Sequence, residues 1–128
     1  MLVATTVPHY IAILLHRPNP DYTYMRLIFL ATTLSIAYHL TDESNLLITA
    51  LDYLVAGALA YHETKIHKHG LLLNSILFLT NLIPVENYTF YHSLWHLASV
   101  AKTIYISNTK IQALSQNKVS ENEGASII

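Results

Sequence analysis

Residues 27–40 read LIFLATTLSIAYHL and decide the fold class, because they continue an apolar run over about four helical turns without proline, glycine or formal charge. Four further apolar stretches lie at residues 2–15, 46–61, 71–83 and 88–106. Turn and charge signals separate them, such as RPNPD at 17–21 and TDESN at 41–45. We therefore expect an all-α fold of about five short helices.

The composition favours a lipid environment. Of the 128 residues, 52% are apolar and only 12% are Asp, Glu, Lys or Arg, about half the charged share of a typical soluble domain. We expect an integral membrane helical bundle of five short transmembrane helices, although the stretches fall below the roughly 20 residues that a spanning helix needs. A net charge of −1 offers no basic patch for nucleic acid, and the absence of cysteine excludes disulfides and thiolate metal ligands.

The distribution of basic residues predicts a topology. If all five stretches span the membrane, every Lys and Arg falls on one face, at positions 17, 26, 65, 68, 102, 110 and 118. The connections on the other face hold only acidic charge. By the positive-inside rule, the amino end is outside or lumenal and the carboxyl end is cytosolic. Residues 1–16 lack the basic start of a cleaved signal peptide, so we expect them to be structural.

The chain changes character after the fifth stretch. From Ser107 onward, Asn, Gln, Ser, Lys and Glu dominate, and large apolar residues are few. We expect a membrane helical domain at residues 1–106 and a polar, disordered cytosolic tail at residues 107–128.

Five residues with metal-site chemistry interrupt the apolar stretches: Ser35, His39, Asp52, His92 and His96. Ser35 and His39 are four apart, as are His92 and His96, so each pair shares one helix face. The predicted topology places all five in the outer half of the membrane. A buried imidazole is costly unless it is paired or bound to metal, so this convergence predicts a metal site.

Three histidines and one water form the open tetrahedral zinc site of hydrolytic enzymes. In such a site Asp52 would orient or deprotonate the water, and Ser35 would hydrogen-bond the water or a developing oxyanion. Other histidines fit less well: residues 62, 67 and 69 lie beside Lys65 and Lys68 and are interpreted as a solvated loop, and positions 9 and 16 have no evident companions.

The pattern of these residues resembles that of the CREST superfamily of membrane proteins. SIAYHLTD at 35–42, Asp52 and HSLWH at 92–96 are most similar to the transmembrane protein 8 and myomaker group, beside the alkaline ceramidases and the progestin and adipoQ receptors. The resemblance implies zinc held by His39, His92 and His96, with Asp52 and Ser35 around the bound water. The family normally has seven helices, whereas this sequence predicts five.

The leading expectation is therefore a zinc-dependent membrane hydrolase acting on a lipid amide or ester bond. One alternative is a non-catalytic membrane protein, either a reduced CREST-like scaffold or an accessory subunit of a membrane complex. A lower-ranked alternative is a bis-histidine haem protein using His39 with His92 or His96, which leaves Asp52 unexplained. The expected partner is a membrane lipid, and the sequence leaves protein partners and a homo-oligomer open.

Overall fold

The computed structural model describes residues 2–15, 21–41 and 44–126, and all regular structure within these ranges is helical. Its elements are α1 (Leu2–Thr6), α2 (His9–Leu15), α3 (Tyr22–Leu40), α4 (Leu46–Ile66), α5 (Gly70–Asn81) and α6 (Tyr88–Ser126). The predicted all-α class is confirmed.

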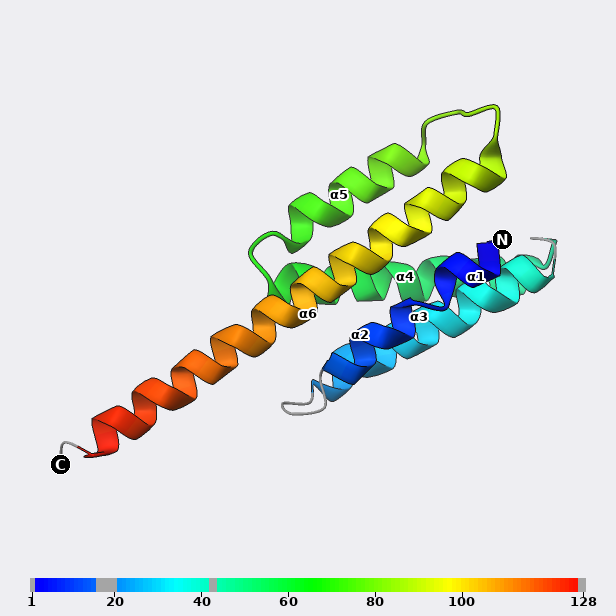
Figure 1. Cartoon of the computed structure of the whole chain (residues 1–128). Coiled ribbons are helices and arrows are strands. Elements are labelled where there is room, and N and C mark those ends of the chain that lie inside the picture. Colours follow the sequence, from blue (N-terminus) through cyan, green and yellow to red (C-terminus); the bar gives the residue numbers. More distant parts are fainter. Residues whose placement is uncertain (1, 16–20, 42–43, 127–128) are drawn as a thin grey trace.

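The first predicted helix is divided in two by Pro8. Proline lacks the backbone N–H, and its ring clashes with the carbonyl one turn earlier, so the helix is interrupted there. The carbonyl oxygens of Val7 and Pro8 instead accept hydrogen bonds from the N–H groups of Tyr10 and Ile11, each at 3.0 Å. These bonds start α2, and α1 and α2 follow one another as one kinked rod (Figure 1).

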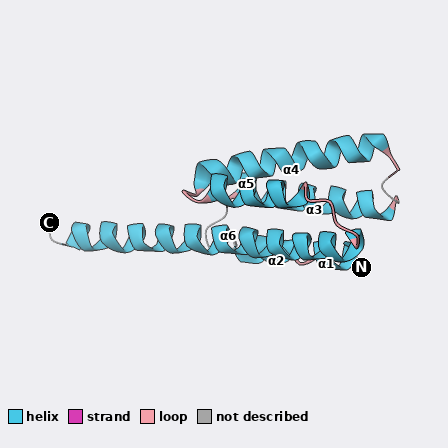
Figure 2. Cartoon of the chain, turned by 90° about the horizontal axis from the view of Figure 1, so that it is seen from above, coloured by secondary structure: helices cyan, strands magenta, loops and turns pink. Residues whose placement is uncertain are grey.

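Counting α1 and α2 as one rod, the described helices form a closed ring of five rods. The amino-terminal rod contacts α3, α3 contacts α4, α4 contacts α5, α5 contacts α6, and α6 returns to α1 and α2. Successive rods run in opposite directions (Figure 1). Because the number of rods is odd, α6 and the amino-terminal rod lie side by side and parallel, with α4 across the bundle from them (Figure 2).

The carboxyl-terminal segment is helical, which differs from the expected disordered tail. Helix α6 continues through the residues after Ser107 and ends at Ser126. It projects beyond the ring (Figure 1), and every described side chain from residue 112 to residue 125 is exposed. The segment contains no proline, and the Ala, Gln, Lys and Glu residues within it are good helix formers.

Basic residues gather toward one end of the ring. This end carries the α2–α3 and α4–α5 connections and the projecting part of α6, and the described Lys and Arg residues lie there at positions 26, 65, 68, 102, 110 and 118. Arg17 lies outside the described residues. The opposite end carries the α3–α4 and α5–α6 connections, with Glu86 in the latter. The segregation of basic residues that the sequence predicted is thus kept among the described residues.

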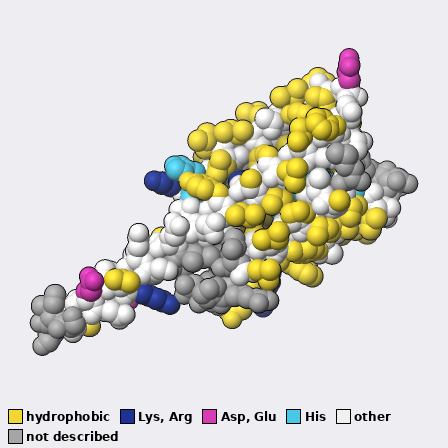
Figure 3. Space-filling model, viewed as in Figure 1, with side chains coloured by type: hydrophobic (Ala, Val, Ile, Leu, Met, Phe, Trp, Pro, Cys, Tyr) yellow, Lys and Arg dark blue, Asp and Glu magenta, His cyan; other side chains and the backbone are white. Residues whose placement is uncertain are grey.

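The bundle combines a small apolar core, which includes Ile28, Leu59 and Ile106, with buried polar side chains and an extensive apolar surface. Glu63, Thr103 and Ser107 are fully buried, whereas large apolar side chains such as Leu46 and Leu54 are 85% and 69% exposed. Apolar atoms cover much of the face seen in Figure 3. In other proteins, large exposed apolar patches are typical of surfaces that contact lipid or another protein. Within the described residues, none of the helices combines the length and the apolar character required to cross a membrane.

Four helices meet in a buried polar network, to which each contributes one side chain. The Glu63 carboxylate of α4 accepts hydrogen bonds from the Tyr24 hydroxyl of α3 at 2.9 Å and from the Asn74 amide of α5 at 2.9 Å. The Lys102 ammonium of α6 donates to Glu63 at 2.5 Å and to Asn74 at 2.9 Å. Side-chain exposure is only 7% for Lys102 and 0% for Glu63.

The start of α5 lies directly against the end of α4. A Cβ atom on Gly70 would approach the backbone oxygen of Glu63 to 2.3 Å, so only glycine fits at this position. The close approach keeps Asn74 of α5 within reach of α4, where its amide donates to the Glu63 carboxylate at 2.9 Å. The sharp α4–α5 connection therefore supports the geometry of the buried network.

A second polar cluster, formed by Asp21, His62 and Lys110, joins α3, α4 and α6 at the end of the ring that carries the basic residues. Asp21 caps α3 by accepting a hydrogen bond from the backbone N–H of Tyr24 at 2.9 Å. Its other carboxylate oxygen accepts from the ammonium of Lys110 on α6 and from Nε2 of His62 on α4 at 3.4 Å. Burial alone would raise the pKa of Asp21, but the hydrogen bonds from Lys110 and Tyr24 lower it from 3.8 to about 2.

This lowered pKa gives a pH-dependent contribution to folding. The Asp21 carboxylate binds its proton less tightly in the folded chain than in the unfolded chain. Its contribution to the free energy of unfolding is therefore complete above about pH 4 and is lost as the pH falls toward about 2. We expect Asp21→Asn to lower the melting temperature Tm at pH 7 and the difference from wild type to shrink across that pH window. Glu121→Gln, on an exposed position of α6, serves as the control and should leave Tm unchanged. A constant difference at all pH values would contradict the assignment.

Candidate metal centre

Three histidines meet at the end of the ring opposite the basic residues. His39 lies in the last turn of α3, and His92 and His96 lie in the first three turns of α6. Asn87 sets the start of α6, since its side-chain oxygen accepts a hydrogen bond from the N–H of Phe90 at 3.1 Å. In the ring, α1 and α2 separate α3 from α6, so the imidazoles approach one another through the interior.

The three imidazoles are close enough to share one metal ion. Each offers a ligand nitrogen, and these three atoms lie within 4.8 Å of one another. The Nε2 atoms of His39 and His96 are 2.9 Å apart, and the ring centroids of His92 and His96 are 4.7 Å apart. The predicted convergence of these three residues is therefore present in the structure.

Aromatic side chains hold the histidine rings. Tyr88 and Trp95 stack on His92 at centroid distances of 5.0 and 5.5 Å. The indole N–H of Trp95 also donates to the carbonyl of Leu77 at 2.7 Å, which ties this part of α6 to α5. His96 is itself only 4% exposed. The rings are thus oriented by packing, as a preorganised metal site requires.

The group of metal-ligand atoms consists of the three histidines and does not include the carboxylate of the predicted set. Ser35 is on α3, one turn before His39, and is half-buried. Asp52 is half-buried in the second turn of α4, and its carboxylate does not belong to the group of ligand atoms within 4.8 Å. The structure therefore brings together three of the five residues and leaves the roles of Ser35 and Asp52 as predictions.

The donor set fits a zinc ion. Zinc binds imidazole nitrogen at ~2.0–2.1 Å, so two nitrogens on one ion are at most about 4 Å apart. The Nε2 atoms of His39 and His96, 2.9 Å apart, are within that limit, and all three ligand nitrogens lie within 4.8 Å of one another. Imidazole ligands also suit copper, iron and nickel, and geometry rather than affinity alone selects between these metals.

His9 has a defined place that sequence reasoning missed. It is 8% exposed, and its Nδ1 and Nε2 atoms lie 3.0 Å from the Thr6 carbonyl oxygen and 3.2 Å from the Ser99 hydroxyl. Ser99 lies about one turn beyond His96 on α6. The contact joins the amino-terminal rod to α6 close to the metal centre. No short-range pattern reveals it, because His9 and Ser99 are 90 positions apart.

The interpretation of residues 62, 67 and 69 as a solvated loop is wrong at two positions. His62 lies within α4, is half-buried, and its Nε2 is 3.4 Å from an Asp21 carboxylate oxygen. The second position is His67. That side chain is only 7% exposed, and its Nδ1 accepts a hydrogen bond from the backbone N–H of His69 at 3.0 Å. His69 and Lys68 are exposed, as expected. Burial against α6 explains the difference, since the Tyr105 ring packs on His67 at a centroid distance of 5.2 Å.

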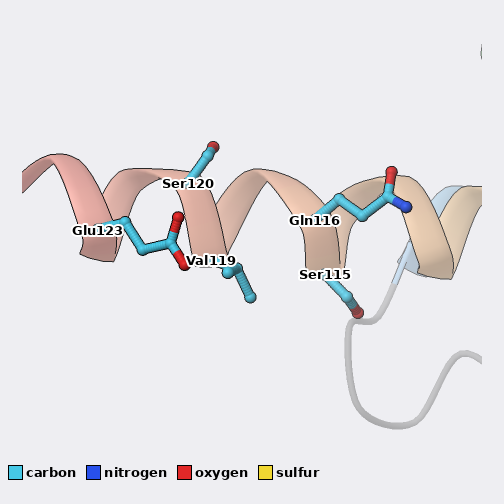
Figure 4. A pocket seen from close by; sticks show the side chains of 5 residues that line it. All are labelled: Ser115, Gln116, Val119, Ser120 and Glu123. Carbon is cyan, nitrogen blue, oxygen red and sulfur yellow. The ribbon is translucent and has the colours of Figure 1, made fainter.

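Neither of two surface hollows is lined by the three histidines of the metal centre. One, of about 310 Å³, is lined only by residues 115, 116, 119, 120 and 123 of the projecting part of α6 (Figure 4). The side chains in Figure 4 come from a single helix, so they form an open surface and not an enclosed site. The other, of about 320 Å³, lies between α5 and α6.

The chain matches no known family model, no curated protein and no solved structure.

Proposed function

We propose that this chain is a zinc-dependent hydrolase of the membrane, acting on an amide or ester bond of a lipid. The observation that carries the proposal is the cluster of His39, His92 and His96, whose ligand atoms lie within 4.8 Å of one another. Three-histidine sites with an open fourth position are typical of hydrolytic zinc enzymes.

The buried polar network and the extensive exposed apolar surface support a membrane location. The interior of the ring holds the bonded polar network of Glu63 and Lys102 beside its apolar core, and many large apolar side chains are exposed on the outside. In a bilayer, ionisable residues occupy the interior of a helical bundle in this way. The gathering of Lys and Arg at one end supports an orientation with that end in the cytosol and the metal centre toward the other face.

In the proposed reaction, the residues of the chain would have distinct roles in metal binding and proton transfer. His39, His92 and His96 hold the metal and are kept in place by the stacked rings of Tyr88 and Trp95. When bound, zinc supplies Lewis acidity toward a carbonyl group and makes water a nucleophile near neutral pH. Asp52 accepts the proton of the attacking water and returns it to the leaving group.

Ser35 completes the proposed arrangement as a hydrogen-bond donor. It lies one turn before His39 on α3, so its hydroxyl is on the same helix face. A donor at this position would stabilise the negative charge that develops on the carbonyl oxygen during attack.

Replacing Asp52 with Asn tests the proposed base. General acid–base catalysis contributes 10²- to 10⁴-fold, so turnover of a fluorescent lipid amide or ester should fall by about that factor. The zinc content should stay unchanged, because Asp52 is outside the group of metal ligands. Glu86→Gln makes the same change of carboxylate to amide at an exposed position on the same end of the ring, and it should retain full turnover. Full turnover in Asp52→Asn would refute the role of this residue.

A non-catalytic scaffold is the second candidate, and the enclosure of His96 favours it. This ligand is only 4% exposed, and a closed site is typical of structural zinc. A scaffold would bind zinc and lose stability without it, yet hydrolyse neither lipid amides nor lipid esters.

A further inference from the structure

An apolar groove follows the seam between α5 and α6. It has a volume of about 320 Å³, and its walls include Leu73, Ile76 and Leu77 of α5 and Ala98 and Ala101 of α6. The two alanines are exposed, as is 49% of Ile76, so the groove opens on the outer surface of the ring. The small alanine side chains leave the space that larger residues would fill.

The floor of the groove is electrically neutral despite containing a lysine. Lys102 lines the groove, but its ammonium group points to Glu63 at 2.5 Å and Asn74 at 2.9 Å. Its side chain therefore presents methylene groups to the groove, as long basic side chains do when they cover apolar surface. An apolar chain in the groove would meet no unpaired charge from Lys102.

One end of the groove reaches the basic connection between α4 and α5. Tyr105 lines this end, and its hydroxyl lies 3.1 Å from Nδ1 of the exposed His69. The neighbouring Lys68 is also exposed, and residues 64–70 contain no acidic side chain. Figure 3 shows Lys or Arg atoms and His atoms together beside apolar surface over this connection. A cationic rim thus adjoins an apolar groove.

We propose that this groove binds one acyl chain of an anionic phospholipid, with the lipid phosphate against Lys68 and His69. An anionic phospholipid matches both features, because its phosphate complements the basic rim and its acyl chain matches the apolar walls. These features favour a phospholipid over a second copy of the chain as the occupant. The proposal rests on the membrane location proposed above, and it names a bound lipid distinct from the substrate at the metal centre. Basic pockets between helices on the cytoplasmic side recognise anionic headgroups in this manner.

Native mass spectrometry of the detergent-purified full chain tests the site. The probes are phosphatidylglycerol and phosphatidylcholine with the same acyl chains, and inorganic phosphate is the competitor. We expect phosphatidylglycerol to bind about fivefold more tightly, the ratio that corresponds to about 1 kcal/mol from the single lysine charge at the headgroup. Lys68→Ala should abolish this preference, whereas Lys118→Ala, on the projecting part of α6, should keep it.

A second variant separates the acyl chain from the headgroup. Ala101→Leu fills the groove and should weaken both lipids at least fivefold, while Ala58→Leu, the same change at an exposed position of α4, should not. Equal binding of the two lipids, full displacement by inorganic phosphate, or unchanged binding in Ala101→Leu would overturn the proposal. Zinc content is measured on the same samples, and Ala101→Leu should retain zinc. Failure of the lipid-binding proposal can therefore be distinguished from failure of the zinc assignment.

Discussion

Lys102→Met is expected to destabilise the bundle by about 3–5 kcal/mol, because it leaves the fully buried Glu63 carboxylate without its ion pair. That loss is a large part of the roughly 5–15 kcal/mol that stabilises a typical domain. The reason lies in the network, where one carboxylate accepts hydrogen bonds from side chains of three other helices. Thermal unfolding of detergent-purified protein, followed by circular dichroism, measures the effect.

The paired substitution distinguishes a lost ion pair from a lost packing contact. In Glu63→Gln/Lys102→Met no charge remains buried at this position, so much of the stability should return. Lys118→Met removes the same charge from an exposed position of α6 and should leave Tm unchanged. A double variant as unstable as Lys102→Met alone would contradict the account.

Zinc should stabilise the folded chain strongly, and this effect should disappear when two ligands are removed. A ligand present at one hundred times its dissociation constant stabilises a protein by about 2.7 kcal/mol. At about 2–8 °C per kcal/mol for small domains, Tm should rise by roughly 10 °C. In His92→Ala/His96→Ala the rise should be absent, because only His39 of the three ligands remains.

His69→Ala is the matched control for this experiment. His69 is an exposed imidazole at the other end of the ring, outside the group of three ligands. Its loss should leave the zinc-dependent rise in Tm intact. An equal rise in the double variant would show that zinc acts elsewhere on the chain.

Local patterns in the sequence predicted the rods but not their ends. Apolar runs between turn signals identify all five rods, because helical periodicity is a local property. The break at Pro8 follows from proline chemistry and was within reach of sequence reasoning. The helical conformation after Ser107 was not anticipated, since low hydrophobicity predicts disorder when no partner is visible.

The metal cluster was predictable because of its regular spacing. His92 and His96 share a helix face at positions i and i+4, and alternation of the rods places the end of α3 and the start of α6 at the same end of the ring. The flanking residues Tyr88 and Trp95 lie at the same helical spacings but indicated only an interfacial aromatic belt. Their stacking on His92 depends on rotamers, which sequence spacing does not determine.

The buried ion pair was beyond local reasoning. Glu63 and Lys102 are 39 positions apart, and each lies near the end of an apolar stretch, where a charge is ordinarily solvated. Only the closure of the ring, with α6 between α5 and the amino-terminal rod, brings Lys102 inward. Asn74 then connects the pair, which requires the tight α4–α5 connection at Gly70.

The metal content of the purified full chain tests the central claim most directly. Inductively coupled plasma mass spectrometry on detergent-purified wild type should find about one zinc per chain, and His92→Ala/His96→Ala should contain almost none. His69→Ala should retain the zinc of wild type. Well-folded wild-type protein without zinc after purification in zinc-supplemented buffer would contradict the assignment of His39, His92 and His96 as a zinc site.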